Sequence, residues 1–91
     1  MIAGFKDKDA EQLFKTRQAS KRLSSYADAA LRKLVIVDAA TSIDDLRNPP
    51  GNDLKQIGET WQIRINRQYR VRFTWDGRDA HDVEVGDFHS G

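Results

Sequence analysis

The sequence predicts an α+β fold, in which an N-terminal strand and a hairpin of two helices pack on one face of a mainly antiparallel C-terminal sheet. Three observations lead to this expectation. Up to about residue 40, apolar residues recur at steps of three and four, which is the spacing of an amphipathic helix. Two prolines within residues 48–52 then interrupt the pattern. Beyond them apolar and polar residues alternate, as they do in half-buried strands.

The first half of the chain contains the predicted helices. Residues 2–5 are expected to form a short strand. Residues 7–16 are expected to form a helix with an apolar stripe, and Asp7 at its start is a residue type that caps helices. Ser24 and Ser25 are expected to cap a second helix that ends near residue 40. Two such helices with a short link form a hairpin that can cover a sheet.

The second half contains three predicted strands between residues 61 and 86. Apolar side chains must oppose apolar side chains across a hairpin, because a slip of one residue turns a strand over. In the first hairpin this condition favours a three-residue loop, 66–68, which places Arg64 opposite Arg70.

The same matching of apolar residues favours a three-residue loop, 76–78, in the second hairpin. That register places Asp82 opposite Arg72 and Glu84 opposite Arg70.

Composition excludes several classes of site. The 91 residues suffice for one domain, expected to cover residues 1–91. The chain has no cysteine and two histidines, so we expect neither a metal nor a cofactor. No apolar run approaches the roughly 20 residues of a membrane span, and residues 1–7 lack the apolar segment of a secretory signal. A cytoplasmic location with no membrane partner is therefore expected.

Positive charge is concentrated on the first predicted hairpin. The net charge is only +1, yet the stretch 60–72 contains four arginines and no acid: Arg64, Arg67, Arg70 and Arg72. A local basic patch on a nearly neutral protein suits a specific anionic ligand. Like charges directly opposite in a sheet are unfavourable, so the predicted facing pair of Arg64 and Arg70 requires an explanation.

Two explanations are open for these arginines. One is a bound anion such as an RNA phosphate, and the other is neutralisation by Glu84 and Asp82. Arginine–carboxylate pairs are common on protein surfaces, so both interpretations stand for Arg72. The central position of Arg70 in the patch favours a functional role.

The chain ends on a second group of polar residues. Glycine within a strand often marks a bulge, and a bulge at Gly86 would turn Asp87 and His89 onto the arginine side of the sheet. An acid, an imidazole and a guanidinium at one phosphate suit RNA transesterification without a metal. The alternative is that His89 is a frayed, solvent-exposed terminal histidine.

Aromatic residues raise a further choice between stacking on bases and packing in the core. The strand aromatics share the face of the aliphatic residues, so they are interpreted as core; they are Trp61, Tyr69, Phe73 and Trp75. Phe88, beside the candidate site, is the best candidate for stacking on a base. His81 is interpreted as structural or exposed. The N-terminal lysines, including Lys6, are interpreted as solvated helix charges.

Five stretches, in the right order, carry a family pattern: IAGFKDKDAEQLF at 2–14, RKLVIVDAA at 32–40, LRNPPGNDL at 46–54, WQIRINRQYRVRF at 61–73 and DVEVGDFH at 82–89. With them the chain resembles the HigB "host inhibition of growth" toxins of the RelE/ParE superfamily. The resemblance implies a ribosome-dependent endoribonuclease that cuts mRNA in the A site and inhibits translation. It also implies a cognate antitoxin, usually a helix-turn-helix repressor similar to HigA.

By position in this pattern, the resemblance implies that Arg70 is the phosphate-binding arginine, and that Asp87 and His89 correspond to the family's acidic residue and terminal histidine. These three are the expected catalytic residues. The expected RNA contacts are Lys55, Arg64, Arg67, Arg72 and Phe88.

The chain departs from the family pattern at three places. Members commonly end in Asp-Tyr-His, whereas this chain has Phe88, which can stack but cannot transfer a proton. Members can carry a histidine before the first hairpin strand, where this chain offers only Lys55. The connection before Trp61, residues 58–60, is also short. These departures bear on the efficiency of cleavage, and they leave two alternatives: a ParE-like gyrase inhibitor, or a weakly active partner in repression of the operon.

Overall fold

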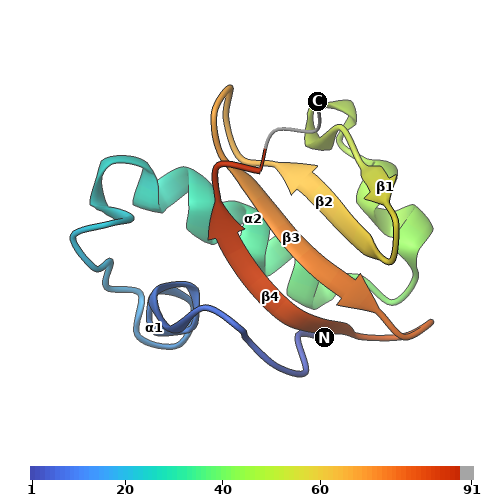
Figure 1. Cartoon of the computed structure of the whole chain (residues 1–91), viewed down its shortest axis with the longest axis horizontal. Helices are drawn as coiled ribbons and strands as arrows, with labels where there is room; N and C mark the ends of the chain where they lie inside the picture. The colour runs from blue at the N-terminus through green and yellow to red at the C-terminus, as the bar shows by residue number, and fades with distance from the viewer. Residues whose placement is uncertain (89–91) are drawn as a thin grey trace.

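In the computed structural model, which describes residues 1–88, an antiparallel sheet of four strands lies against helix α2 (Figure 1). The sheet order is β1-β2-β3-β4, and α1 lies beside β4. The predicted α+β fold is confirmed. None of the helices among residues 1–88 combines the length and apolar character needed to cross a membrane. The elements are α1 (Lys8–Thr16), α2 (Ala27–Ala39), β1 (Lys55–Ile57), β2 (Thr60–Arg64), β3 (Arg70–Trp75) and β4 (Ala80–Gly86).

Helix α1 begins where the sequence predicts. The Oδ1 atom of Asp7 accepts hydrogen bonds from the backbone N–H groups of Asp9, at 2.9 Å, and Ala10, at 3.3 Å. These bonds satisfy donors that a helix start otherwise leaves without a partner. The helix buries Ala10 and Leu13.

Helix α2 begins differently from the prediction. Ser24–Tyr26 form a turn of 3-10 helix that runs directly into α2, and no side chain caps either element. The predicted cap is therefore wrong, because the serines are already within a helical turn and not at an extended residue before one. The hydroxyl of Ser24 instead donates to the carbonyl of Lys21 at 2.9 Å.

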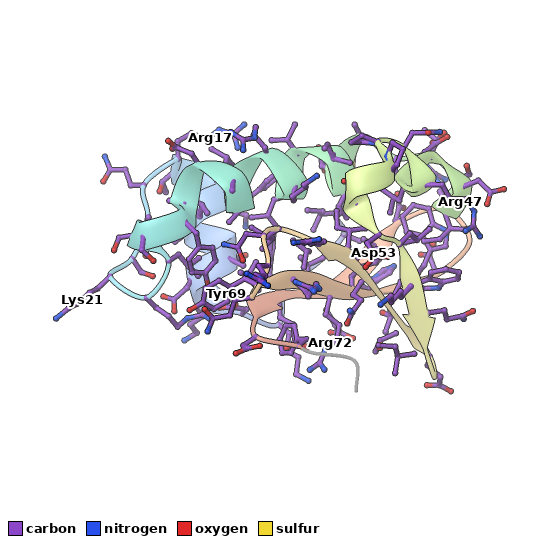
Figure 2. All side chains as sticks on the ribbon, turned by 90° about the horizontal axis from the view of Figure 1, so that it is seen from above. Arg17, Lys21, Arg47, Asp53, Tyr69 and Arg72 are labelled. Atoms are coloured by element: carbon purple, nitrogen blue, oxygen red, sulfur yellow. The ribbon has the colours of Figure 1, made fainter. Side chains whose placement is uncertain are left out.

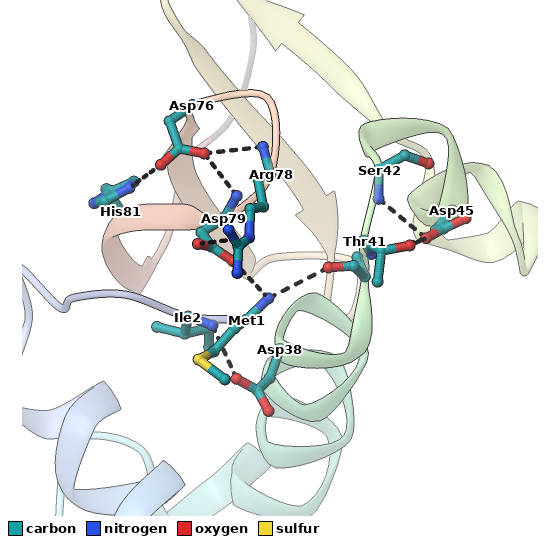
Figure 3. A network of polar contacts seen from close by, with 11 residues as sticks. Met1, Ile2, Asp38, Thr41, Ser42, Asp45, Asp76, Arg78, Asp79 and His81 are labelled. Atoms are coloured by element: carbon teal, nitrogen blue, oxygen red, sulfur yellow. Dashed lines mark hydrogen bonds and ion pairs between the residues drawn. The ribbon is translucent and has the colours of Figure 1, made fainter.

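The N-terminal segment runs along the outer edge of β4 without forming a full strand. Two isolated parallel bridges join Ile2 to Ala80 and Phe5 to Val83. The backbone N–H of Ile2 turns the other way and donates to Oδ1 of Asp38 on α2 at 2.8 Å (Figure 3). The predicted strand is thus reduced to two isolated bridges, whose backbone hydrogen bonds occupy part of an edge that would otherwise present unpaired groups.

The proline loop is ordered around one buried amide. The side chain of Asn52 is fully buried and donates from Nδ2 to the carbonyls of Leu46, at 3.2 Å, and Asn48, at 3.1 Å. Its Oδ1 accepts from Nζ of Lys33 on α2 at 2.6 Å. Burial lowers the pKa of Lys33. The loop is therefore fixed to α2 by an amide whose polar groups are satisfied.

Strand β1 follows this loop and was not predicted. Its three residues are all exposed, so the strand has no buried face, and no alternation of apolar and polar side chains marks it in the sequence. A two-residue turn at 58–59, with Gly58 at a φ of 61°, joins β1 to β2. A left-handed φ of this kind favours glycine.

The first large hairpin has the predicted register. Arg64 pairs with Arg70, and Ile63 pairs with Val71. The loop 66–68 is stabilised by Asn66, whose Oδ1 accepts from the backbone N–H groups of the residues two and three places later.

The second hairpin does not have the predicted register. Trp75 pairs with Ala80, so the turn has four residues, 76–79, and not three. The turn is longer because Oδ1 of Asp76 accepts from the backbone N–H groups of Arg78, at 2.9 Å, and Asp79, at 2.7 Å (Figure 3). Without a compensating change, this extra residue would move the apolar side chains of β4 from the core face of the sheet to the other face.

A β-bulge in β4 returns the apolar side chains of this strand to the core face of the sheet. Two residues, Asp82 and Val83, stand opposite the single residue Phe73, and Asp82 has a φ of 52°. The turn and the bulge together shift the pairing by two residues. Arg72 therefore pairs with Glu84, and Arg70 pairs with Gly86. The predicted pairs of Arg72 with Asp82 and of Arg70 with Glu84 are wrong.

The core lies between the helices and the sheet. Leu34 and Val37 of α2 and Val71 and Val83 of the sheet are fully buried. The core interpretation of the strand aromatics is confirmed, because Phe73 is buried and the other three are half-buried against the core. Tyr69 also stacks on Tyr26, with ring centroids 3.9 Å apart.

The turn at Asp76 predicts a pH dependence of stability. Hydrogen bonds from Asp79, His81 and Arg78 lower the pKa of Asp76 from 3.8 to about 2. A carboxyl whose pKa is lower in the folded state stabilises the fold above its unfolded pKa, and the effect disappears as the pH falls through its folded pKa. Asp76→Asn is therefore expected to lower the thermal midpoint at pH 7. The difference from the native chain should shrink between about pH 4 and pH 2 in circular-dichroism melts. A difference that is the same at pH 7 and pH 2 would contradict this account.

Candidate nucleic-acid interface

The face of the sheet opposite α2 carries most of the predicted RNA-contacting residues. Directly opposed residues of neighbouring strands point to the same side, and the register places two rows together there. In Figure 2, α2 lies along one side of the sheet and Arg72 projects from the other. We call this surface the arginine face; its members are Lys55, Gln62, Arg72 and Glu84 in one row and Arg64, Arg70 and Gly86 in the next.

Arg64 and Arg70 face each other and share one backbone acceptor. Nε of Arg64 donates to the carbonyl of Asn66 at 3.1 Å, and Nη1 of Arg70 donates to the same carbonyl at 2.7 Å. Neither arginine forms an ion pair with a carboxylate of residues 1–88. A carbonyl dipole only partly offsets two guanidinium charges, so this row attracts anions.

Arg70 is also held in place by the loop that it borders. Its Nη1 atom lies 3.0 Å from the carbonyl of Tyr69 and 3.4 Å from that of Arg67. All three bonds use Nη1, which leaves Nε and Nη2 of the guanidinium as further donors. Arg67 itself is exposed within the loop.

Arg72 is neutralised by an acid, although not by the one predicted. Nε and Nη2 of Arg72 both donate to Oε2 of Glu84 at 3.2 Å. The ring of Phe88 covers the guanidinium, with Cζ of Arg72 3.9 Å from the ring centroid. This stacking is favourable because the ring face is electronegative. Of the two explanations for Arg72, neutralisation is therefore the one that the structure supports.

Lys6, interpreted from the sequence as a solvated helix charge, lies next to this ion pair, a contact that the sequence did not predict. Nζ of Lys6 is 3.9 Å from Oε2 of Glu84, and the side chain is 65% exposed. Its position follows from the bridge between Phe5 and Val83, which joins segments far apart in the chain. The sequence carries no local signal for such a contact.

Lys55 and Gln62 occupy the other end of the same row. Lys55 is on the edge strand, half-exposed, with Nζ 3.6 Å from a carboxylate oxygen of Asp53. Gln62 is buried, at 2% exposure. Lys55 is therefore on the predicted face but at its margin, and its charge is partly offset by a neighbouring acid.

The end of β4 reaches this site without the predicted bulge. Gly86 pairs regularly with Arg70, so the bulge lies at Asp82 and not at Gly86. Asp87 is exposed, and its Oδ2 accepts from Nε2 of Gln68 at 3.3 Å. Gln68 and Arg70 belong to the same hairpin, so Asp87 lies beside the loop that Arg70 holds. His89 lies outside the described residues.

Comparisons with known proteins agree with the sequence pattern. Residues 3–89 match the model of the HigB-like toxin family, described as the RelE-like toxin of the type II toxin–antitoxin system HigB. The chain is similar to Toxin HigB-1 of Vibrio cholerae, with 41% identity over 82% of this chain and 84% of the relative. It is also similar to a Haemophilus influenzae protein of uncharacterised function, with 32% identity over 78% of this chain and 73% of the relative.

The contact between Phe88 and Gly86 can be tested directly. A Cβ at position 86 would lie 2.9 Å from Cζ of the Phe88 ring, so Gly86→Ala should displace the ring from Arg72. With Cζ of Arg72 3.9 Å from the ring centroid, the ring current should shift the Nε–H resonance of Arg72, and this shift should disappear in the NMR spectrum of the variant. Gly4→Ala is the matched control, because a Cβ there meets nothing within 4 Å. An unchanged Arg72 resonance in Gly86→Ala would show that the stack does not depend on the glycine.

Proposed function

The chain belongs to the HigB-like toxins, the RelE-like toxins of type II toxin–antitoxin systems. From this family and from the arginine face, we propose that the chain is a metal-independent endoribonuclease. In this proposal it cleaves mRNA on the ribosome and thereby inhibits translation. One observation carries the proposal. Arg64 and Arg70 face each other without a carboxylate partner among residues 1–88, beside the loop that Asp87 contacts. Two facing cations, with an acid at the adjoining loop, suit a phosphodiester under attack.

In this proposal Arg70 binds the scissile phosphate. Its Nη1 atom is used by the loop carbonyls, and its other N–H groups donate to the phosphate oxygens. A guanidinium held in one orientation loses little freedom when it binds an anion. Arg64 adds a second charge from the facing strand, and Arg67 contacts the adjacent backbone from the loop.

The proposed reaction is a transesterification, in which phosphorus exchanges its bond to the 5′-oxygen for a bond to the 2′-oxygen of the neighbouring ribose. A base removes the proton of the 2′-hydroxyl, the 2′-oxygen bonds to phosphorus, and the bond from phosphorus to the 5′-oxygen breaks. The leaving oxygen takes a proton from an acid. The products are a 2′,3′-cyclic phosphate and a 5′-hydroxyl. We assign these proton transfers to His89, since imidazole titrates near neutral pH, and to Asp87.

Phe88 supplies the stacking surface for a base. One side of its ring is occupied by Arg72, and the cation behind the ring fixes its plane. The other side is assigned to a base of the RNA, because single-stranded RNA is commonly held by such stacking. Lys55 and Lys6 contribute charge at the margins of the arginine face.

A toxin of this class has an antitoxin partner, which we propose to be a HigA-like helix-turn-helix repressor. Its other partners in the proposal are the ribosome and mRNA, and the place of action is the cytoplasm. A weakly active protein that serves mainly in repression of the operon is a second candidate. The observation that favours it is Phe88, which has no hydroxyl to share in proton transfer.

Growth inhibition and primer extension test the nuclease. In cells that express the native chain we expect mRNA ends at fixed codon positions. Arg70→Ala and His89→Gln should each abolish growth inhibition and slow cleavage by about a hundredfold or more, a size typical of losing a preorganised donor. Arg70→Lys should fail as well, because an ammonium lacks the planar fork. Arg47→Gln is the control, since Arg47 forms an exposed ion pair with Asp44.

The outcomes separate the candidates. Intact mRNA with DNA damage would indicate a gyrase inhibitor, and intact mRNA with operon repression would indicate the co-repressor. Full toxicity of soluble Arg70→Ala and His89→Gln would remove both residues from the mechanism. Because Arg70→Ala also removes hydrogen bonds to the loop, its folding is checked by a thermal melt.

Phe88→Tyr tests the departure from the family pattern. The ring keeps its stacking face and gains a hydroxyl, so cleavage should be preserved or raised. The measurement is the cleavage rate on ribosome-bound mRNA, compared with Phe88→Leu, which should lose the stack. A large loss of activity in Phe88→Tyr would show that the ring edge is packed too closely for a hydroxyl.

A further inference from the structure

We propose that Arg22, in the link between the two helices, is a positioning residue that fixes the end of β4 and thereby sets the path of residues 87–88. The inference rests on the proposed nuclease function, because its consequence is for the cleavage step.

Three nitrogens of Arg22 bind three different groups. Nη1 donates to the backbone carbonyl of Val85 at 2.8 Å, Nε donates to Oδ2 of Asp9 at 2.7 Å, and Nη2 donates to Oδ2 of Asp7. The planar fork of a guanidinium permits such a set of bonds, whereas a single ammonium does not.

Asp7 completes the contact with β4. Its Oδ2 atom also accepts from the backbone N–H of Val85 at 3.0 Å. Both backbone polar groups of Val85 are therefore bound by side chains from the helical half of the chain. The parallel bridges of the N-terminal segment reach only to Val83, so this pair of side chains holds the strand edge where the bridges end.

The position of this contact links it to the site. Gly86 follows Val85 directly and pairs with Arg70, and Asp87 then contacts Gln68. A shift of Val85 would change where the chain leaves the sheet. Misplacing a reacting group by about 1 Å can slow catalysis by about a hundredfold.

Charge pairing alone does not require a contact of this form. The pair of Arg22 with Asp9 is 44% and 36% exposed, and exposed ion pairs contribute little to stability, whereas Asp7 is only 14% exposed. A lysine would satisfy the charge of Asp9 equally well. Only the bonds to the backbone and to Asp7 require the fork, and these are the bonds that fix β4.

Arg22→Lys and Arg22→Gln test the inference, with two matched controls. Asp9→Asn removes the charge of one Arg22 partner but leaves the contacts with Asp7 and Val85. Arg47→Gln breaks an exposed arginine–aspartate pair that does not involve β4. Arg22→Lys keeps the charge and the stem, so it serves as the test if Arg22→Gln does not fold.

The readout is single-turnover cleavage of mRNA on programmed ribosomes, at a temperature well below each variant's thermal midpoint. We expect the maximum rate of both Arg22 variants to fall about tenfold or more. The toxin concentration giving half the maximum rate should change less than about threefold, since the phosphate-binding arginines are untouched. NMR amide shifts of residues 85–88 should move in the Arg22 variants and stay unchanged in both controls.

Two results would overturn the inference, and they differ from failure of the proposed function. If the native chain cleaves and the Arg22 variants cleave at its rate while melting earlier, Arg22 is merely structural. If Asp9→Asn slows cleavage as much as Arg22→Lys does, the contact with β4 is not responsible. If the native chain itself does not cleave mRNA, the proposed function fails and the positioning role fails with it.

Discussion

The carboxylate of Asp7 joins three parts of the molecule that lie far apart in sequence. One oxygen caps α1, and the other accepts from Arg22 in the helix link and from the backbone of Val85 in the last strand. A group with several acceptor sites on two oxygens can make all these bonds at once. Asp7 therefore fixes the helical half of the chain against the end of β4. The candidate site begins at this end of β4, so its geometry depends on that contact.

The two faces of the sheet differ in character, because one is apolar and buried and the other is charged. On the helix side, apolar side chains from three strands are buried against α2. On the arginine face, charge is left partly unbalanced, since Glu84 pairs with Arg72 and Lys6 while Arg64 and Arg70 share only a carbonyl. Facing like charges are unfavourable in a sheet, and they are kept here where an anion would relieve them. This imbalance connects the fold with the proposed chemistry.

Local patterns predicted the parts of the fold that local rules determine. The cap at Asp7, the loop 66–68 and the pairing of Arg64 with Arg70 each follow from side-chain type and alternation within a few residues. Strand β1 was missed because three exposed residues carry no alternation. The second hairpin was wrong by two residues, since an Asp76 turn and a bulge at Asp82 both depend on backbone conformation and cancel in the apolar pattern. The place of Lys6 depends on a long-range bridge, which no single-sequence pattern reveals.

The cancellation in the second hairpin has a consequence for how this family can vary. The extra residue in the turn at 76–79 is tolerated because β4 carries an extra residue of its own at Asp82. Losing either one alone would expose Val83 and Val85 and turn Glu84, which lies between them, toward the core. Length changes at the two places should therefore arise together during evolution, as paired insertions or paired deletions, although the regularly paired residues 80 and 81 separate the turn from the bulge.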